Sequence, residues 1–256
     1  MNIIKKQKLY GNIHLVQIKA PEIAKKARPG HFVLVQLDEK SIRIPIPIAD
    51  ADKTSITLIF KAHDKATEAL AQSRKNQSCY VVLGPLGTPR EIKEYGKVVL
   101  VGEGEGIGLV YFYAKHLKEA GNRIISLLGG VPKKNIFWAD KIEKVSDKTF
   151  VIDPESDFAE PLKHALEQVL RKVRIDQVIS FASASLMSSL TQITKLRTKH
   201  YAYLTATMLD GIGMCGSCRV SCNGEQKLCC VEGPEMDAHA IDWESYLHRL
   251  GEYTRI

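Results

Sequence analysis

The sequence lacks any hydrophobic run long enough to cross a membrane. No stretch of about 18 apolar residues occurs, so we expect no membrane span. The first ten residues are polar and rich in lysine, without the apolar stretch that directs secretion, so we expect no secretory signal and a cytoplasmic location. Internal repeats and low-complexity tracts are also absent, which excludes solenoid and fibrous architectures.

Concentrated basic charge is missing too, although positive charge is in excess. The chain has 36 Lys and Arg against 29 Asp and Glu, a formal net charge of +7. No basic run is long enough for a nucleic-acid arm, and aromatic residues do not interleave with basic ones as on a stacking platform. We therefore expect no nucleic-acid partner. The excess positive charge either forms a solvated lysine-rich surface or favours binding to acidic partners such as nucleotides or an acidic redox protein.

Cysteine is scarce over most of the chain and abundant near its end. Five of the six cysteines fall between Cys215 and Cys230. A disulfide-bonded domain spreads its cysteines and is usually secreted, whereas one tight cluster predicts a metal or iron–sulfur site in a reducing compartment. The sixth, Cys79, lies in an apolar segment and is predicted to be part of the core.

The cysteine-rich segment has the ligand spacing of a plant-type [2Fe–2S] site, with an aspartate in the first place. Asp210, Cys215, Cys218 and Cys230 are separated by four, two and eleven residues, and such sites use C-x4-C-x2-C with a distant fourth ligand. Glycines at 211, 213 and 216 let the backbone approach the inorganic core. We predict these four residues as the metal ligands, and Cys222 and Cys229 as packing residues.

A structural zinc site in a regulatory binding module is the alternative. It would use Cys215, Cys218 and two of Cys222, Cys229, Cys230 and His239. Four-cysteine zinc sites normally use two separated pairs, whereas the second pair here is adjacent in the sequence. The spacing therefore favours the two-iron cluster.

The secondary-structure pattern divides the rest of the chain into two segments. Residues 1–95 predict an antiparallel β-barrel or sandwich, with short β-branched strands at 12–19, 31–37, 55–61 and 79–83. Residues 96–205 alternate strands (97–101, 123–128, 149–152, 177–181, 201–204) with helices (109–120, 136–145, 161–173, 186–196). This alternation predicts a doubly wound parallel α/β sheet. Residues 206–256 hold the cysteine cluster and end in a short polar tail.

Two stretches around the cysteines resemble a known family. Gly213-Met-Cys-Gly-Ser-Cys-Arg-Val220 and Cys230-Val-Glu-Gly-Pro-Glu-Met-Asp237 are similar to the C-terminal signature of a ferredoxin-reductase-like family. That family contains the electron-transfer subunit of dihydroorotate dehydrogenase and the small (alpha) subunit of NADH-dependent ferredoxin:NADP oxidoreductase, also known as sulfide dehydrogenase. The latter uses an aspartate as its first cluster ligand, which Asp210 matches. The resemblance implies an FAD-binding barrel over 1–95, an NAD(P)-binding α/β domain over 96–205 and a [2Fe–2S]-binding segment over 206–256.

The resemblance also implies a function. Electrons would pass between NAD(P)H, FAD and the [2Fe–2S] cluster to a larger flavoprotein or iron–sulfur subunit of a hetero-oligomer, with a ferredoxin as the other expected partner. The chain would then be an NAD(P)H-dependent oxidoreductase subunit of the ferredoxin–NADP reductase type. Hydride transfer needs no acid–base side chain, and no catalytic residue is predicted.

Residues that bind FAD are carried over from motifs in the first segment. Arg43-Ile-Pro-Ile-Pro47-Ile-Ala-Asp50 resembles the family's flavin-binding strand, Arg-Ile-Pro-Leu-Thr-Ile-Ala-Asp. The resemblance places FAD contacts at Arg43, Pro45, Ile46, Pro47, Phe60, Lys61, Ala66 and Thr67. Pro47 departs from the family's threonine or serine and removes both a hydroxyl and a backbone N–H. Arg43 is either a phosphate ligand or an exposed charge at the edge of a strand.

The nucleotide loop departs further from the family pattern. Gly102-Glu103-Gly104-Glu105-Gly106 stands where the family has Gly-Gly-Gly-Val-Gly, so Gly102, Gly104 and Gly106 are predicted nucleotide contacts with two carboxylates beside them. Like charges in a partly dry cleft cost on the order of 1 kcal/mol or more. The alternative function is therefore a non-catalytic electron-transfer or assembly subunit that keeps the cluster but has lost the pyridine nucleotide site.

Overall fold

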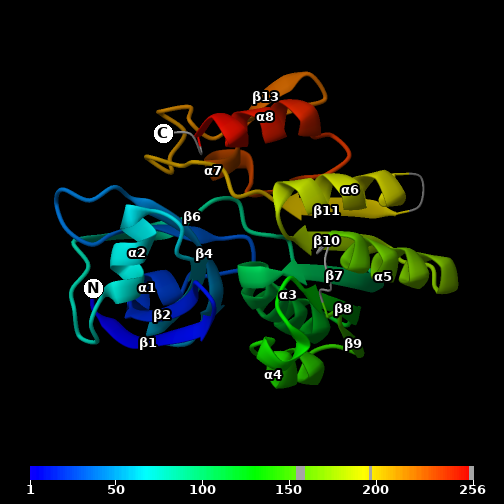
Figure 1. The fold of residues 1–256 in the computed structure, drawn as a ribbon, viewed down its shortest axis with the longest axis horizontal. Helices are drawn as coiled ribbons and strands as arrows, with labels where there is room; N and C mark the ends of the chain where they lie inside the picture. Colours follow the sequence, from blue (N-terminus) through cyan, green and yellow to red (C-terminus); the bar gives the residue numbers. More distant parts are fainter. Residues whose placement is uncertain (154–158, 196–197, 254–256) are drawn as a thin grey trace.

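The chain folds into three parts that pack together (Figure 1). The computed structural model describes residues 1–153, 159–195 and 198–253. An antiparallel barrel forms the N-terminal part, a parallel α/β sheet follows, and the cysteine-rich segment lies over both, at the top of Figure 1. This arrangement confirms the predicted fold class.

The barrel is a six-stranded antiparallel sheet in the order β1-β2-β5-β4-β3-β6. It closes where Asn2 bridges Ser78 and where the Cys79 N–H donates to the Met1 oxygen at 2.8 Å. Alternate side chains point inward and fill a hydrophobic core that includes Cys79, as predicted. The strands are β1 (Ile3–Tyr10), β2 (Ile13–Lys19), β3 (Phe32–Gln36), β4 (Ile44–Ala51), β5 (Ser55–Lys61) and β6 (Val81–Leu86).

Besides β4, which only the family resemblance indicated, three barrel elements were not predicted from the sequence. Strand β1 is a polar edge strand in which Ile3 alone is fully buried, so it lacks the apolar alternation of a core strand. Helix α1 (Pro21–Ala24) is a single turn. Helix α2 (Lys65–Gln72) begins with a capping box, in which the Asp64 carboxylate accepts the N–H of Thr67 at 2.7 Å. Leu70 of this helix is fully buried in the barrel core.

The α/β sheet has the strand order β14-β11-β10-β7-β8-β9, in which β14 spans Glu235–Asp237. The five strands β7 to β11 are parallel to one another. The order reverses between β7 and β10, which is the switch point where doubly wound sheets bind ligands. Helices α3 and α4 cover one face and α5 and α6 the other (Figure 1). The elements are β7 (Lys97–Glu103), α3 (Ile107–Glu119), β8 (Arg123–Gly129), α4 (Ala139–Lys144), β9 (Lys148–Val151), α5 (Ala159–Lys172), β10 (Gln177–Phe181), α6 (Ala184–Thr194) and β11 (Lys199–Tyr203).

All four predicted helices differ at their ends. The helices expected over 109–120 and 161–173 each begin two residues earlier, at Ile107 and Ala159. The helix expected over 136–145 begins only at Ala139, because Trp138 adopts a left-handed conformation with φ of 60° after a short 3-10 turn, η2 (Lys133–Asn135). The helix expected over 186–196 begins two residues earlier, at Ala184, and its predicted last residue lies outside the described residues.

The C-terminal segment is more ordered than its sequence indicated. Strand β14 (Glu235–Asp237) pairs antiparallel with β11 and so extends the α/β sheet. The prediction of a short polar tail is wrong, because helix α8 (Trp243–Tyr253) packs Trp243, Tyr246 and Leu250 onto the core of the segment. The remaining elements are β12 (Arg219–Cys222), β13 (Glu225–Leu228) and α7 (Cys229–Glu232).

Helix α3 joins the sheet to the barrel. An added Cβ at Gly108 would lie 2.8 Å from Cδ1 of Ile59 and 3.1 Å from Cβ of Ala49, so the helix backbone approaches β4 and β5 closely. Lys115 of the same helix pairs with Asp50 at 3.6 Å. Within the described residues, no helix combines the length and apolar character that a bilayer span requires.

A buried histidine links three elements of the α/β part. The Nε2 atom of His200 lies 2.9 Å from the Ser180 hydroxyl, and its Nδ1 atom lies 3.1 Å from the Thr194 hydroxyl. Burial, with a smaller contribution from the nearby His239, lowers the pKa of His200 from 6.5 to about 3.

The lowered pKa of His200 predicts acid sensitivity. The unfolded chain binds a proton at His200 below pH 6.5 and the folded chain does not, so stability is complete above 6.5 and is lost as the pH falls toward 3. We expect this residue to lower the free energy of unfolding by about 2 kcal/mol between pH 7 and pH 5. Urea unfolding of the wild type and of His200→Gln at both pH values measures it, and an equal pH dependence in the two proteins would contradict the assignment.

Candidate functional site

The predicted metal ligands lie on one loop and one short helix of the C-terminal segment. Asp210, Cys215 and Cys218 belong to the loop between β11 and β12, and Cys230 belongs to α7. The three glycines of the loop have φ values of 71°, 86° and 66°, in the left-handed region that side chains with a Cβ avoid. The loop between β11 and β12, called the cluster loop below, can therefore curve around a compact group. Gly211 of this loop packs against Leu34 of the barrel.

The structure brings these four residues together as two pairs. The Asp210 carboxylate accepts the backbone N–H of Cys215, and its other oxygen accepts the N–H of Ile212 at 3.0 Å. The Cys218 sulfur accepts the N–H of Cys230 at 3.5 Å, and the two thiols interact. Each iron of a [2Fe–2S] centre takes two protein ligands. Two pairs of donors therefore fit a two-iron core.

A single-ion site fits less well. Among the described residues, no three His, Cys, Asp or Glu side chains are placed to hold one metal ion, whereas a structural zinc needs four ligands around one point. Cys222 and Cys229 are buried in the hydrophobic core of the segment, where the Cys229 sulfur contacts that of Met236 at 3.9 Å. His239 is directed to the Thr194 hydroxyl at 3.1 Å. Three of the four residues from which the zinc alternative would take its other two ligands thus have other contacts.

The two pairs differ in electrostatics. In the outer pair, the backbone N–H of Ile212 is the main group that lowers the pKa of Asp210, and the Ser217 hydroxyl lowers that of the exposed Cys215. In the inner pair, burial and the neighbouring Cys218 raise the pKa of Cys230 to about 12. Hydrogen bonds therefore favour the ionised forms of Asp210 and Cys215, whereas burial disfavours the thiolate of Cys230 until a metal cation binds it.

One face of the barrel adjoins the cluster loop. Pro45 and Pro47 of β4 lie directly opposite Leu34 and Phe32 of β3, so all four side chains share a face. Phe32 and Leu34 belong to the hydrophobic core of the C-terminal segment, and Cδ1 of Leu34 lies 3.0 Å from the position of a Cβ added at Gly211. The strand that resembles a flavin-binding strand therefore lies beside the candidate metal centre.

The predicted FAD residues divide by exposure. Arg43 and Lys61 are exposed, and Pro45, Pro47 and Ala66 are half-buried. Ile46 and Phe60 are 1% and 5% exposed in the barrel core, and the Thr67 hydroxyl is used in the capping box of α2. The side chains of these three residues are turned away from any ligand on the outer face.

The predicted nucleotide loop follows β7 at the switch point of the sheet. A Cβ added at Gly106 would lie 2.0 Å from the carbonyl oxygen of Phe181, so the fold itself requires glycine there, and the φ of 57° at Gly104 favours glycine at that position. Gly102 packs against Val110 and Ile107 of α3 in the same way. These contacts explain the glycines without a ligand.

The acidic residues of this loop have partners that the sequence did not indicate. The Glu103 carboxylate accepts the N–H of Ser183 at 2.8 Å, just before α6, and so bridges the ends of β7 and β10. Desolvation raises the pKa of Glu105, Lys61 acts in the opposite direction, and Glu103 raises it further. Lys61 of the barrel therefore lies within electrostatic reach of the nucleotide loop.

Arg90 is a second feature that the sequence did not reveal. It lies in the connection between β6 and β7, where its side chain is 4% exposed and forms an ion pair with Glu235 of β14. A buried arginine has no local sequence signal, because its partner is 145 residues away.

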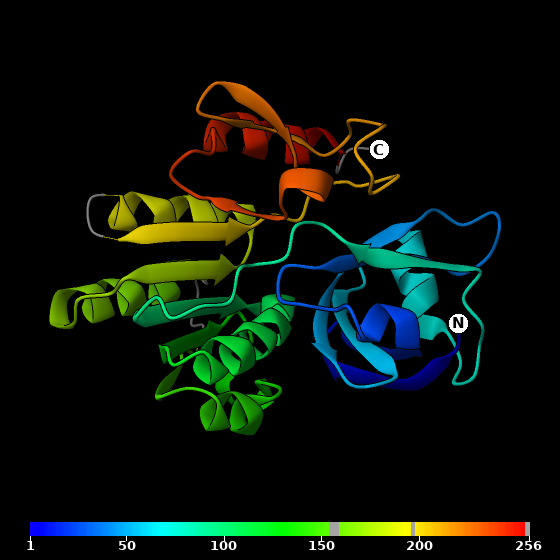
Figure 2. The same ribbon diagram turned by 180° about the vertical axis from the view of Figure 1, so that it is seen from behind.

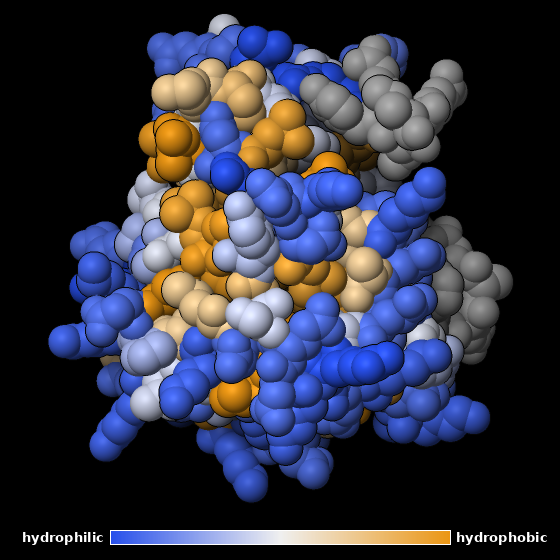
Figure 3. All heavy atoms as spheres, turned by 90° about the vertical axis from the view of Figure 1, so that its left-hand side faces the viewer, coloured by the Kyte–Doolittle hydropathy of each residue, from blue (hydrophilic) through white to orange (hydrophobic). Residues whose placement is uncertain are grey.

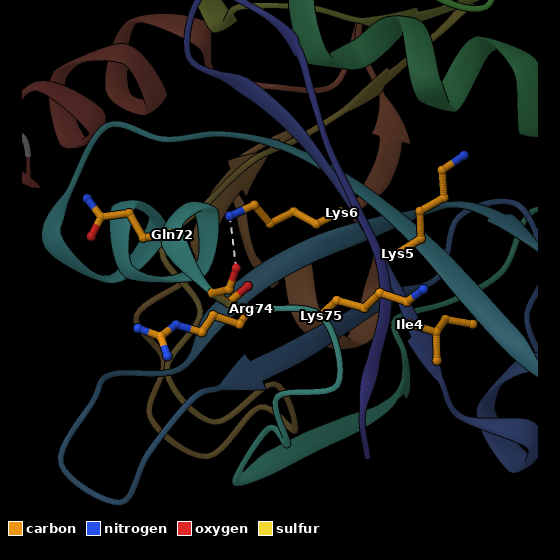
Figure 4. Close-up of a pocket in the computed structure, with 7 residues that line it drawn as sticks. Ile4, Lys5, Lys6, Gln72, Arg74 and Lys75 are labelled. Atoms are coloured by element: carbon orange, nitrogen blue, oxygen red, sulfur yellow. Dashed lines mark hydrogen bonds between the residues drawn. The ribbon is translucent and has the colours of Figure 1, made fainter.

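A cavity of 570 Å³ lies on the barrel, between β1 and the turn after α2 (Figure 4). Lys6 donates to the carbonyl oxygen of Ser73 at 2.8 Å, and the charged ends of Lys5, Arg74 and Lys75 point in different directions in Figure 4. None of the predicted site residues lines this cavity, which is formed by Ile4, Lys5, Lys6, Gln72, Ser73, Arg74 and Lys75.

Comparisons with known proteins identify relatives of the chain. Residues 205–242 match the sequence family described as the iron–sulfur cluster binding domain of dihydroorotate dehydrogenase B. The chain is 35% identical over 255 residues to the dihydroorotate dehydrogenase B (NAD(+)) electron transfer subunit homolog of Thermotoga maritima, which covers 98% of this chain and 90% of that protein. It is 26% identical to the corresponding electron transfer subunit of Shouchella clausii, over 91% of this chain and 94% of that protein.

Solved structures show the same similarity. A chain of the NADH-dependent reduced ferredoxin-NADP oxidoreductase, studied for flavin-based electron bifurcation, superposes with a TM-score of 0.92 at 35% identity. The match covers 98% of this chain and 93% of that one. A mutant ferredoxin-NADP+ reductase from Plasmodium falciparum superposes with a TM-score of 0.63 over 79% of this chain and 94% of that one, and at 12% identity it shows the fold alone.

Proposed function

Because this chain belongs to the family of dihydroorotate dehydrogenase B electron-transfer subunits, we propose that it carries electrons between NAD(P)H, FAD and a [2Fe–2S] cluster and passes them to a larger partner. The observation that carries the proposal is the arrangement of Asp210, Cys215, Cys218 and Cys230 as two donor pairs beside one face of the barrel. In this proposal residues 1–95 bind FAD, 96–205 bind the nucleotide and 206–256 hold the cluster.

The protein's own groups account for cluster binding. The outer pair consists of the half-buried Asp210 and the exposed Cys215, and hydrogen bonds lower the pKa of both, so this pair is more accessible to incoming iron than the inner one. The inner pair, Cys218 and Cys230, is buried and holds the core away from water. A carboxylate is a harder ligand than a thiolate, so Asp210 makes the two irons inequivalent.

The barrel supplies a flavin face beside this centre. When bound, a flavin accepts a pair of electrons as hydride and releases them singly. We assign its contacts to the exposed cations Arg43 and Lys61 and to the outward face at Pro45, Pro47 and Ala66. Arg43 and Lys61 would neutralise phosphate charge, and the two prolines present a rigid apolar surface to a ring.

A hydrophobic surface next to the cluster loop is where we place the larger partner. Figure 3 shows hydrophobic side chains gathered on the face formed by the barrel and the C-terminal segment. Met214 of the cluster loop is 84% exposed, and large exposed apolar groups of this kind mark interaction sites. The other exposed apolar residues of these two parts include Ile42, Tyr80, Leu209, Ile212 and Val231.

Anaerobic purification followed by a visible spectrum tests the proposal. We expect two irons, two sulfides and one FAD per chain, and bleaching of the flavin absorption on adding NADH or NADPH. A colourless protein that contains zinc and no sulfide would overturn the cluster assignment.

A second candidate function is favoured by Glu103. Its carboxylate lies at the switch point of the sheet, where the phosphates of a nucleotide would lie. There it accepts a hydrogen bond from the Ser183 N–H. In this candidate the chain keeps the cluster and the flavin but takes its electrons from the partner subunit. Flavin that is bleached by dithionite and by neither NADH nor NADPH would favour it.

Replacement of Glu103 separates the two candidates. Glu103→Gln keeps an acceptor for the Ser183 N–H and removes the charge. If the nucleotide binds here, its affinity should rise about fivefold, since a nearby like charge costs about 1 kcal/mol. Calorimetric titration with NADH and NADPH measures the change, and Glu119→Gln at the far end of α3 is the matched control. If neither variant binds NADH or NADPH, the second candidate function is favoured.

A further inference from the structure

Arg90 lies where the three parts of the molecule meet. Its guanidinium forms an ion pair with Glu235 of β14 and donates to the side-chain oxygen of Gln177 in β10. The rings of Tyr95 and Tyr201 flank it, with centroids 4.8 and 4.9 Å away. The arginine is therefore held by the C-terminal segment on one side and by the α/β sheet on the other.

The backbone around Arg90 completes the junction. The Arg90 N–H donates to the carbonyl oxygen of Pro29 in the barrel at 2.8 Å. Two residues earlier, the Thr88 N–H donates to the Gly233 oxygen at 2.7 Å and its hydroxyl donates to the Val231 oxygen at 2.6 Å. Figure 2 shows this connection passing between the barrel and the sheet, beneath α7. The residues that directly follow Cys230 are thus fastened to the β6–β7 connection.

Stability alone does not account for the ion pair. In the described part of the chain, the Nε atom of Arg90 and the second carboxylate oxygen of Glu235 are buried without a hydrogen-bond partner. Burying an incompletely bonded pair gains little over apolar residues of the same volume. The planar guanidinium does, however, fix the relative orientation of the groups it bonds, because its donors form a rigid fork.

We propose that Arg90 is a positioning residue that fixes the cluster-bearing segment against the flavin-bearing face of the barrel. The inference rests on the proposed function. Glu235 lies five residues after Cys230, and Pro29 lies three residues before Phe32, which faces that segment. Through its side chain and its backbone, Arg90 therefore connects the residues that follow Cys230 to strand β3, which borders the proposed flavin face. Electron transfer between the two centres depends on this separation.

The test compares single and paired replacements in the full-length protein. Arg90→Met alone leaves the Glu235 carboxylate buried without its partner and should lower the thermal midpoint. Arg90→Met with Glu235→Met removes both charges and should recover most of the midpoint. Arg90→Lys keeps the positive charge but loses the rigid, planar set of guanidinium donors. Lys118→Met, at an ion pair on the surface of the sheet, is the matched control.

Two measurements separate positioning from stability. Hydrogen exchange of the amides in 230–237 needs neither cofactor, and it should be at least tenfold faster in the paired variant than in the wild type. The rate at which the cluster is reduced after the flavin should fall severalfold, because electron transfer weakens exponentially with the distance between the two centres. Arg90→Lys should be intermediate in both, and Lys118→Met unchanged.

The outcomes are distinct. If the paired variant recovers its midpoint together with wild-type exchange and wild-type electron transfer, Arg90 serves only to neutralise a buried charge, and the proposal is overturned. If the wild type holds no cluster or flavin, the proposed function fails, but the exchange measurement still decides whether Arg90 anchors the segment. Faster exchange at a restored midpoint supports the anchor, and unchanged exchange rejects it.

Discussion

Replacement of Cys218 by serine should remove most of the iron and sulfide from the purified protein, together with its visible absorption. Cys218 is 1% exposed and belongs to the inner ligand pair, where its sulfur already accepts the Cys230 N–H. A serine hydroxyl keeps the shape but is a poor iron ligand at neutral pH. Because even changes to outer groups of metal sites cost tenfold to a hundredfold in affinity, we expect the iron content to fall by more than about tenfold.

Cys222→Ser is the matched control for this experiment. Cys222 is also buried, at 4% exposed, in the same hydrophobic core, but it lies in β12 and outside the two pairs. It should keep its iron and sulfide while losing some stability. Equal iron loss in both variants would mean that folding of the segment, and not ligation, controls the iron content. Retention of iron in Cys218→Ser would remove Cys218 from the ligand set.

Gly106→Ala should destabilise the protein more than any other single methyl addition in the nucleotide loop. The added Cβ would lie 2.0 Å from the Phe181 carbonyl oxygen and 3.0 Å from the Phe181 Cβ, so β10 and the start of α3 must separate. Forcing atoms into a packed interior costs about 1 to 3 kcal/mol and sometimes more, and backbone on both sides places this case at the upper end. Urea unfolding of the cofactor-free protein measures the loss.

The matched control is Gly251→Ala in α8, where an added Cβ would lie within 4 Å of none of the described residues outside its own helix. Replacing glycine by alanine inside a helix should stabilise it by about 0.5 to 1 kcal/mol. A Gly106→Ala protein that is as stable as the wild type, but binds nucleotide less well, would instead show that the glycine serves a ligand. The two results therefore separate a packing role from a binding role for the glycine-rich loop.

Local sequence pattern was enough for the fold class and for the choice of candidate metal ligands. Strand and helix periodicities repeat within a few residues, and the spacing of Asp210, Cys215 and Cys218 is contained in a single loop. The glycines at 211, 213 and 216 are informative for the same reason, since a positive φ is a property of one residue. Segments without a clear local period, such as the polar edge strand β1, were not recognised.

Helix α8 illustrates the limit of local pattern. Its sequence is mostly polar, and it is stabilised by a few apolar side chains, including Trp243 and Tyr246, that find their partners in the core of the C-terminal segment. Strand β4, which resembles a flavin-binding strand, illustrates it again. The resemblance names Ile46 beside Pro45 and Pro47, but the alternation of a strand sends Ile46 into the barrel core and leaves the prolines on the face next to the cluster loop.

The amino-acid order thus specifies the elements that have a clear local period and predicts which residues hold a two-iron core, because propensity, periodicity and ligand spacing act over short stretches of chain. Folding in three dimensions settles how the predicted ligands pair, the hydrogen bond that the Ser183 N–H donates to Glu103, and the burial of Arg90 against Glu235. These contacts join residues up to 145 positions apart. Which distant groups meet depends on how sheets and helices pack, and that packing has no signature in any short segment.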